Sequence, residues 1–379
     1  MTDYKQHFLN MAVKGVHSLQ PYQPGKPMSE LQREYGISDI IKLASNENPL
    51  GPSQAAIQAC QSVLPELALY PDGNGFALKQ ALADKHGLDA RCITLGNGSN
   101  DILEFVGRVF LQPGFNAVFS EHAFAVYPLV TMAVGAELNV AKANPADALM
   151  PYGHNLENLL ACVNDRTRVI FIANPNNPTG TWLKSSDLET FLQSIPDNII
   201  VVLDEAYVEY VTEDEYPDSL PWLQRYPNLI VTRTFSKVYG LAGLRIGYSF
   251  SHPDVADLLN RVRQPFNTNA MAQAAAIAAL NDEAHIQNSV QTNLAGLKQV
   301  ANAFEQMNLE QIPSIGNFIS FKTPLPEAQV YDALLRAGVI IRPVGNYGLP
   351  DFLRVTIGSE AQNQRFLAAL KTILEGAHD

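Results

Sequence analysis

The chain has 379 residues, 46% of them hydrophobic, and a formal net charge of −12 at pH 7. This length supplies enough core for two domains, and an acidic chain without a local basic cluster is not expected to bind nucleic acid. No apolar run approaches the ~20 residues of a membrane-spanning helix, and the N-terminus lacks the apolar core of a signal peptide. We therefore expect a cytoplasmic protein that binds no membrane.

Cysteine and histidine spacing argues against structural metal sites and disulfide bonds. The three cysteines, Cys60, Cys92 and Cys162, lie far apart and form no CxxC pair. The eight histidines are scattered without the spacing of metal ligands. We expect neither a disulfide framework nor a bound metal.

The first two thirds of the chain alternate strand and helix patterns. Short strands are predicted at 92–95 and 117–119, with helices at 76–86 and 99–111. The segment 185–195 has helical spacing and a serine cap. Three short, β-branched and almost continuously apolar runs predict parallel strands that are covered on both faces: 168–173, 198–203 and 228–233.

The pattern changes near residue 270. Long helices are predicted at 271–280 and 286–307, followed by a final helix at 360–374. Shorter strands are predicted between them, at 318–321, 339–341 and 352–357. We expect an N-terminal arm at 1–44 that belongs to the small domain, a large domain at 45–268 and a small α+β domain at 269–379.

The most informative segment is 234–248, which places Lys237 among small, hydroxyl and apolar residues. A lysine amine that is withdrawn from water has a lowered pKa and can form a Schiff base with an aldehyde. Thr234, Ser236 and Arg245 add hydroxyls and a guanidinium suited to a phosphate. Together they predict pyridoxal phosphate as the cofactor, although a lone lysine beside a buried strand is more often structural.

A glycine turn at 95–101, with the sequence LGNGSND, follows a predicted strand and opens a helix. Glycines let the backbone approach an anion, and the helix N-terminus offers unpaired N–H groups, so Ser99 and Asn100 are candidate phosphate contacts. The third glycine of a dinucleotide fingerprint is replaced by Asp101. When the turn is taken alone, an ordinary capped helix is the more frequent explanation.

A second turn, NPNNPTG at 174–180, directly follows the predicted strand at 168–173. Two prolines and a glycine make the turn rigid and aim the amide of Asn177, which could donate to a phenolate oxygen. A plain turn and a functional turn are equally supported at this point.

An acidic residue ends the most apolar predicted strand, at Asp204 in the sequence LDEAY. A carboxylate there is costly unless it meets a cation, and the protonated pyridine nitrogen of pyridoxal phosphate is such a cation. Tyr207 would then be directed at O3′ of the ring. A magnesium-binding ATPase carboxylate would need a GxxxxGK[ST] loop, which the sequence lacks.

An aromatic segment at 122–127 follows the predicted strand at 117–119. Phe124 could lie flat over the cofactor ring and exclude water from it. A lone phenylalanine is, however, more often a core residue.

These segments stand in the order and spacing of fold-type I pyridoxal-phosphate enzymes, and nearly the whole chain closely resembles the histidinol-phosphate aminotransferase family. The motifs GNGSND, NPNNPTG, LDEAY and GLAGLRIG carry the resemblance. It implies an α/β fold with a mostly parallel seven-stranded sheet and a smaller α+β domain. It also implies a homodimer with its active site at the subunit interface.

The resemblance implies roles for individual residues. Lys237 would carry the cofactor, with Asp204 and Tyr207 holding its ring and Asn177 contacting O3′. Tyr70 would reach the cofactor phosphate of the neighbouring subunit. The stacking position is commonly tyrosine in this family, and Phe124 keeps the ring face but loses the hydroxyl. The cofactor phosphate would be bound by Ser99, Asn100, Thr234, Ser236 and Arg245.

The implied reaction converts L-histidinol phosphate and 2-oxoglutarate to imidazole acetol phosphate and L-glutamate in histidine biosynthesis. The substrate anion is expected at Arg354, with Arg342 as the alternative and Tyr22, from an arm at 19–27, closing over the substrate. An aromatic amino-acid aminotransferase or a threonine-phosphate decarboxylase would share every cofactor residue. A pyridoxal-phosphate-binding regulator would need a DNA-binding appendage, for which the chain has no spare basic segment.

Overall fold

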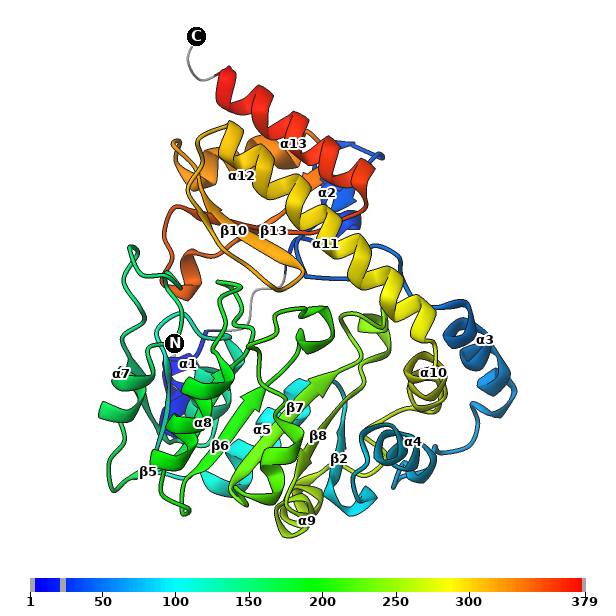
Figure 1. The fold of residues 1–379 in the computed structure, drawn as a ribbon, viewed down its shortest axis with the longest axis vertical. Coiled ribbons are helices and arrows are strands. Elements are labelled where there is room, and N and C mark those ends of the chain that lie inside the picture. The colour runs from blue at the N-terminus through cyan, green and yellow to red at the C-terminus, as the bar shows by residue number, and fades with distance from the viewer. Residues whose placement is uncertain (1–3, 21–24, 377–379) are drawn as a thin grey trace.

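The computed structural model describes residues 4–20 and 25–376. A large sheet lies in the lower part of Figure 1, with helices on both of its faces, and a smaller unit of sheet and helices lies above it. The large sheet has the order β2-β8-β7-β6-β5-β3-β4. Its strands are β2 (Ile93–Gly96), β3 (Asn116–Ser120), β4 (Glu137–Ala141), β5 (Thr167–Ala173), β6 (Ile200–Asp204), β7 (Leu229–Thr234) and β8 (Gly247–Ser251).

The pairing of the large sheet is mostly parallel. Strands β3, β4, β5, β6 and β7 pair in parallel, whereas β8 is antiparallel to both β7 and β2. The predicted mostly parallel seven-stranded sheet is therefore confirmed. The sequence patterns missed β4, which lies at the sheet edge with most residues exposed, and β8, whose glycine and serines interrupt its apolar pattern.

Apolar side chains of the central strands alternate between two hydrophobic clusters. In β5, Ile170 and Ile172 pack on one face of the sheet, while Val169 and Phe171 pack on the other. Burial on both faces explains why these strands read as continuous apolar runs. Helices α4 (Phe76–His86), α7 (Leu156–Ala161), α8 (Ser185–Ser194) and α10 (Ala270–Leu280) contribute to the first cluster; α5 (Ser99–Phe110), α6 (Val126–Ala133) and α9 (Pro253–Val262) contribute to the second.

The smaller unit is built from an N-terminal segment that includes α2 (Met28–Tyr35) and β1 (Ile41–Lys42) and from the C-terminal part of the described chain. Strand β1 pairs in parallel with β11 (Val339–Ile340), which attaches the N-terminal segment to the C-terminal part. An antiparallel sheet has the order β12-β13-β10-β9, formed by β9 (Gln311–Ile312), β10 (Phe318–Lys322), β12 (Arg342–Pro343) and β13 (Phe352–Thr356). Around these strands lie α2, α11 (Glu283–Gln306), α12 (Glu327–Arg336) and α13 (Glu360–Glu375).

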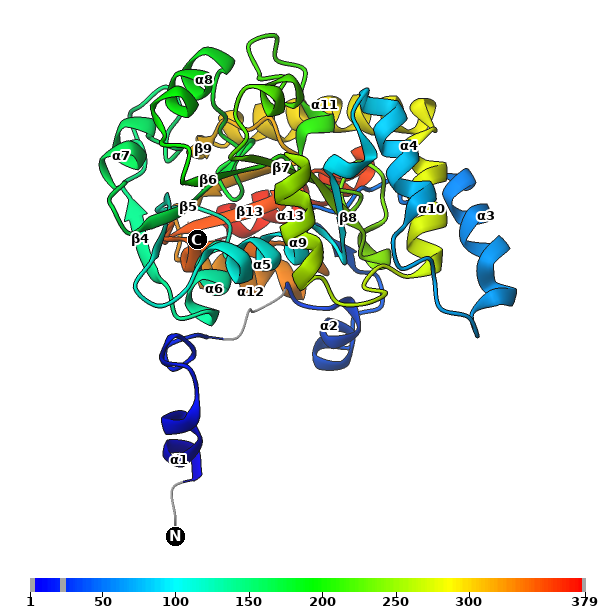
Figure 2. The same ribbon diagram turned by 90° about the horizontal axis from the view of Figure 1, so that it is seen from below.

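Two helices lie towards the edges of the molecule. Helix α1 (Tyr4–Met11) projects from the body in Figure 2, and α3 (Gln54–Val63) packs beside α10.

The serine cap predicted for 185–195 is wrong, because Ser185 is the first helical residue and the capping position is Lys184, whose side chain makes no capping hydrogen bond. Within the part of the chain that the structure describes, no helix combines the length and apolar character needed to cross a bilayer.

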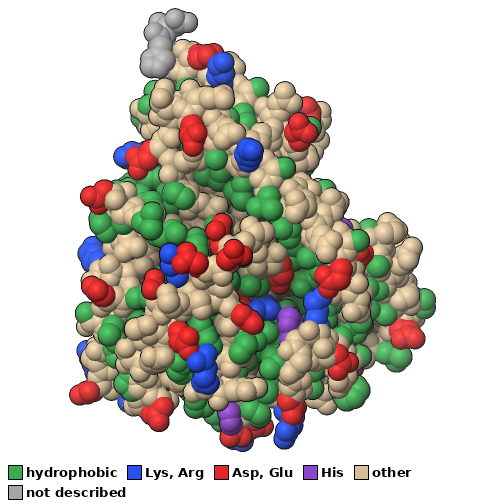
Figure 3. Space-filling view, in the orientation of Figure 1, with side chains coloured by type: hydrophobic (Ala, Val, Ile, Leu, Met, Phe, Trp, Pro, Cys, Tyr) green, Lys and Arg blue, Asp and Glu red, His purple; other side chains and the backbone are tan. Residues whose placement is uncertain are grey.

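One face of the molecule carries charged side chains of both signs (Figure 3). On the face drawn in Figure 3, acidic and basic side chains are interspersed, and no basic area dominates that face. The net charge of −12 is therefore not offset there by the kind of positive patch that binds nucleic acid.

Candidate active site

A cavity of about 270 Å³ lies where the central strands end. Its walls come from the carboxyl ends of β5, β6 and β7, from the segment that follows β1, and from β12 and β13. Open α/β sheets bind ligands at these strand ends. The predicted site residues that line the cavity are Ser99, Asn100, Phe124, Asn177, Asp204, Tyr207, Thr234, Ser236, Lys237, Arg245, Arg342 and Arg354.

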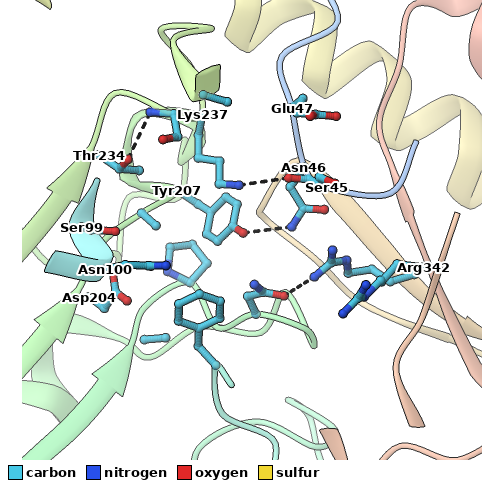
Figure 4. Close-up of a pocket in the computed structure, with 18 of the residues that line it drawn as sticks. Ser45, Asn46, Glu47, Ser99, Asn100, Asp204, Tyr207, Thr234, Lys237 and Arg342 are labelled. Carbon is cyan, nitrogen blue, oxygen red and sulfur yellow. Dashed lines mark hydrogen bonds between the residues drawn. The ribbon is translucent and has the colours of Figure 1, made fainter. Parts of the chain in front are cut away.

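Lys237 projects its amine into this cavity (Figure 4). The Nζ donates a hydrogen bond to the Ser45 carbonyl oxygen at 3.1 Å and lies 5.6 Å from the centre of the Tyr207 ring. Burial, reinforced by the positive charge of Arg354, lowers the pKa of Lys237 to about 7. A large fraction of this amine is therefore neutral at neutral pH and available as a nucleophile or base.

Asp204 ends β6 and is 4% exposed. Its Oδ2 accepts a hydrogen bond from the Tyr127 hydroxyl at 2.9 Å, and its Oδ1 accepts one from the Thr232 hydroxyl at 3.0 Å. Burial raises the pKa of Asp204 to about 6, and the two hydroxyl donors oppose that rise. The carboxylate is thus largely ionised at neutral pH, in a place where a cation would stabilise it.

The Tyr207 hydroxyl accepts a hydrogen bond from Asn46 Nδ2 at 2.9 Å. Asn46 has a φ of 55° and is 1% exposed, and its Oδ1 accepts from the Thr356 hydroxyl at 3.1 Å. Burial raises the pKa of Tyr207 to about 12, so its hydroxyl keeps its proton. Asn46 was missed in the sequence, although the polar run 45–48 directly after an apolar segment marks the place.

One end of the cavity is built to receive an anion. Helix α5 begins there at Ser99, preceded by Gly98 with a φ of 80°. A Cβ at Gly98 would lie 2.3 Å from Arg245 Nη2, so glycine allows the guanidinium to approach the start of the helix. The unpaired N–H groups of a helix N-terminus, an arginine and the nearby hydroxyls of Thr234 and Ser236 form a suitable phosphate site.

The opposite wall carries two arginines. Arg342 and Arg354 are paired across β12 and β13, and both are largely buried. Arg354 donates through Nη1 to Asn177 Oδ1 and through Nη2 to the Ala44 carbonyl oxygen at 2.9 Å. Figure 4 shows Arg342 across the cavity from Asp204. A substrate between these walls would meet an amine, a carboxylate and paired guanidiniums.

Two predicted residues are not brought into this cavity. Tyr70 is 81% exposed, stacks on Phe266 with ring centres 4.5 Å apart, and lies outside the cavity lining that the structure describes. Tyr22 lies outside the described residues. Within residues 4–20 and 25–376, no three histidine, cysteine, aspartate or glutamate side chains gather as metal ligands.

Comparison with known proteins identifies the family. The model of aminotransferase classes I and II matches residues 38–370. The chain belongs to this family. It is 55% identical over 368 residues to histidinol-phosphate aminotransferase 1 of Nitrosococcus oceani, covering 97% of this chain and 98% of that protein. It is 56% identical to histidinol-phosphate aminotransferase 2 of Pseudomonas aeruginosa, covering 98% of this chain and 99% of that protein.

This aminotransferase also resembles a solved structure that contains a bound cofactor. Histidinol-phosphate aminotransferase from Sinorhizobium meliloti, in complex with pyridoxal-5′-phosphate, matches with a TM-score of 0.85 and 27% identity, covering 96% of this chain and 97% of that one. The predicted resemblance and the predicted cofactor are thereby confirmed.

The residues of the cavity fit pyridoxal phosphate. Asp204 is a buried carboxylate held by two hydroxyls, as a protonated ring nitrogen requires. Lys237 supplies an amine with a lowered pKa, as an aldehyde requires. The Gly98 turn with Arg245 supplies the anion site that a phosphate requires. The ring nitrogen, the aldehyde and the phosphate of pyridoxal phosphate would thus each meet a chemically suitable group in the same cavity.

Proposed function

We propose that this aminotransferase interconverts L-histidinol phosphate with 2-oxoglutarate and imidazole acetol phosphate with L-glutamate in histidine biosynthesis. The main observation behind the proposal is that Lys237, Arg342 and Arg354 line the same cavity. Both amino donors, histidinol phosphate and glutamate, carry an anionic group that a guanidinium can bind. Relatives above 50% identity over almost the whole chain support this reaction over an aromatic amino-acid aminotransferase or a threonine-phosphate decarboxylase.

We assign the cofactor contacts to residues of the cavity. Asp204 holds the ring nitrogen, Tyr207 and Asn177 approach O3′, and Phe124 covers the ring face. The hydrogen bond from Arg354 to Asn177 supports this arrangement, because it aims the amide of Asn177. The phosphate is held by Ser99, Asn100, Thr234, Ser236 and Arg245.

The chain's own groups orient the substrate and move its proton. Pyridoxal phosphate, when bound, withdraws the negative charge that develops at the substrate Cα. Lys237 Nζ accepts the Cα proton, which its pKa of about 7 permits. Asp204 stays ionised beside the ring nitrogen, and Arg354 holds the substrate phosphate in one half-reaction and the carboxylate of glutamate in the other.

We also propose the setting in which this chemistry takes place. The protein works as a cytoplasmic homodimer without nucleic acid, and its chain divides into an arm at 1–44, a large domain at 45–268 and a small domain at 269–379. The position of Tyr70 supports a shared active site, because its side chain is 81% exposed and lies outside the lining of its own subunit's cavity.

A single-turnover panel tests the proposed substrate. The purified, cofactor-loaded protein is mixed with histidinol phosphate, glutamate, phenylalanine, tyrosine or threonine phosphate, and the change in cofactor absorbance is followed. We expect the fastest conversion with histidinol phosphate and a clear conversion with glutamate. Faster conversion with phenylalanine or tyrosine, or release of carbon dioxide from threonine phosphate, would contradict the proposed reaction.

The arginine pair offers a second prediction. Arg354→Ala should slow the half-reactions with both histidinol phosphate and glutamate by about 10–150-fold, because each donor loses a charge-assisted bond of ~1.5–3 kcal/mol. Tyr22→Phe should mainly impair histidinol phosphate. Single-turnover rates for each donor separate the variants. If Arg354→Ala spares either donor while Arg342→Ala harms both, the anion site belongs to Arg342.

Shared sites would be revealed by mixed dimers. Tyr70→Phe should weaken cofactor binding, and Lys237→Ala should abolish turnover. A heterodimer that carries one change on each chain should regain about one intact site, because twofold symmetry leaves one site with both native residues. Activity and cofactor content are measured after subunit exchange is verified by mass spectrometry. Exchange without any recovery would place Tyr70 in its own subunit's site.

A further inference from the structure

Asp204 is held by two hydroxyls that do not themselves reach the cavity. Tyr127, from α6, donates to Oδ2 at 2.9 Å, and Thr232, from β7, donates to Oδ1 at 3.0 Å. Both residues are completely buried and lie outside the described lining of the cavity, whereas Asp204 is part of it. The hydrogen bonds of these two hydroxyls therefore act on a ligand in the cavity through Asp204.

The scaffold fixes both donors in place. The Tyr127 ring stacks on Phe171 of β5, with ring centres 4.8 Å apart and planes 6° from parallel. Thr232 lies directly beside Asp204 in the register of β6 and β7. Each carboxylate oxygen thus receives one hydrogen bond from a rigid element, which fixes the plane of the carboxylate and leaves acceptor capacity directed at the cavity.

The two hydroxyls oppose the rise in the pKa of Asp204 that burial causes. Burial raises the pKa of Asp204 to about 6 and Glu205 raises it further, while Tyr127, Thr232 and Lys237 lower it. Burial also raises the pKa of Tyr127 well above its ordinary value, so its hydroxyl remains a donor. Tyr207 and Tyr216 also interact electrostatically with Asp204.

We propose that Tyr127 and Thr232 are positioning residues of this aminotransferase, whose hydroxyls keep the Asp204 carboxylate ionised and aimed at the ring nitrogen of the cofactor. The inference rests on the role of Asp204 in the proposed function. Without the hydroxyls, Asp204 would take up a proton within the neutral range and lose its attraction for a protonated ring nitrogen.

Tyr127→Phe and Thr232→Val test the inference, because each removes one hydroxyl and retains nearly the same shape. The first readout is the infrared band of the protonated Asp204 carboxyl in the cofactor-free protein, recorded against pH and assigned by its loss in Asp204→Asn. The midpoint should move upward by about one pH unit or more in each variant, because one bond to a charged acceptor is lost. Tyr248→Phe, which removes a completely buried tyrosine hydroxyl from the hydrophobic cluster on the other face of the sheet, is the control and should leave the midpoint unchanged.

The second readout uses the loaded enzyme. The ¹⁵N shift of labelled pyridoxal phosphate should show less protonated ring nitrogen in Tyr127→Phe near neutral pH, and the deficit in kcat should shrink as the pH rises and Asp204 ionises again. A merely structural role would leave a deficit that does not depend on pH. If neither variant moves the Asp204 midpoint while both remain folded, the inference is wrong.

The cofactor-free titration separates this inference from the proposed function. An enzyme that prefers another amino donor would still show the shifted midpoint, so the choice of substrate does not affect that result. Thr232→Val provides an independent measurement if Tyr127→Phe unfolds, because Thr232 is held by strand pairing rather than by ring stacking.

Discussion

Replacing Lys237 with alanine should abolish turnover, lowering kcat by at least about 10⁴-fold, because both the nucleophilic amine and the proton acceptor are lost together. Lys42→Ala is the matched control. The Lys42 amine lies 2.6 Å from Glu47 Oε1 at the edge of the site, and we expect a small effect from its loss. Steady-state rates for both variants measure the difference.

Chemical trapping checks the same assignment without measuring turnover. Borohydride reduction of the loaded enzyme, followed by peptide mapping, should place the cofactor on Lys237. A label on another lysine would overturn the assignment. In the unmodified enzyme the proton-transfer rate should rise as the pH increases through about 7, because the amine of Lys237 becomes neutral over that range.

The lowered pKa of Lys237 also predicts how it affects stability. Between about pH 7 and its ordinary value of 10.5, the folded cofactor-free protein binds fewer protons at Lys237 than the unfolded chain does. This lysine therefore lowers the free energy of unfolding progressively as the pH falls through that window. The cofactor-free Lys237→Ala protein should melt at or above the temperature of its parent at neutral pH, so inactivity with a lowered melting temperature would point to misfolding instead.

Asp204→Asn should retain cofactor yet lower kcat by at least about 10³-fold, since the neutral amide no longer stabilises a protonated ring nitrogen while the shape of the side chain is preserved. Cofactor content by absorbance and single-turnover rates measure the two effects separately. Glu205→Gln is a less suitable control, because Glu205 forms a buried ion pair with Arg233 and its loss would disturb the fold. Loss of cofactor without loss of rate in the remaining loaded protein would contradict the role of Asp204.

The stability of the cofactor-free protein should respond to Asp204 with the opposite pH dependence. Its folded pKa of about 6 lies above the ordinary 3.8, so its favourable contribution is complete below pH 3.8 and is lost as the pH rises through 6. We therefore expect the change in melting temperature caused by Asp204→Asn in the cofactor-free protein to be more positive at about pH 8 than at low pH. Melting curves across this range test the burial of the ionised carboxylate.

Several features of this molecule could be predicted from short stretches of sequence. The runs that became β5, β6 and β7 were recognisable because each strand is covered on both faces. Lys237 and Asp204 were recognisable because a charged residue beside an apolar strand is costly without a partner. Strand β4 was missed because it lies at an exposed edge, and β8 because its pattern is interrupted by small polar residues.

The sequence by itself determined the fold class, the cofactor and the residues at the ends of the central strands, because these depend on local patterns and on motifs. The tertiary structure alone decided which groups complete the site. Asn46 meets Tyr207 and Thr356, and Tyr127 meets Asp204, across separations of 77 to 310 residues. A hydrogen bond between distant segments has no period in the sequence, since it arises only when the sheets and helices pack and bring both ends to one place.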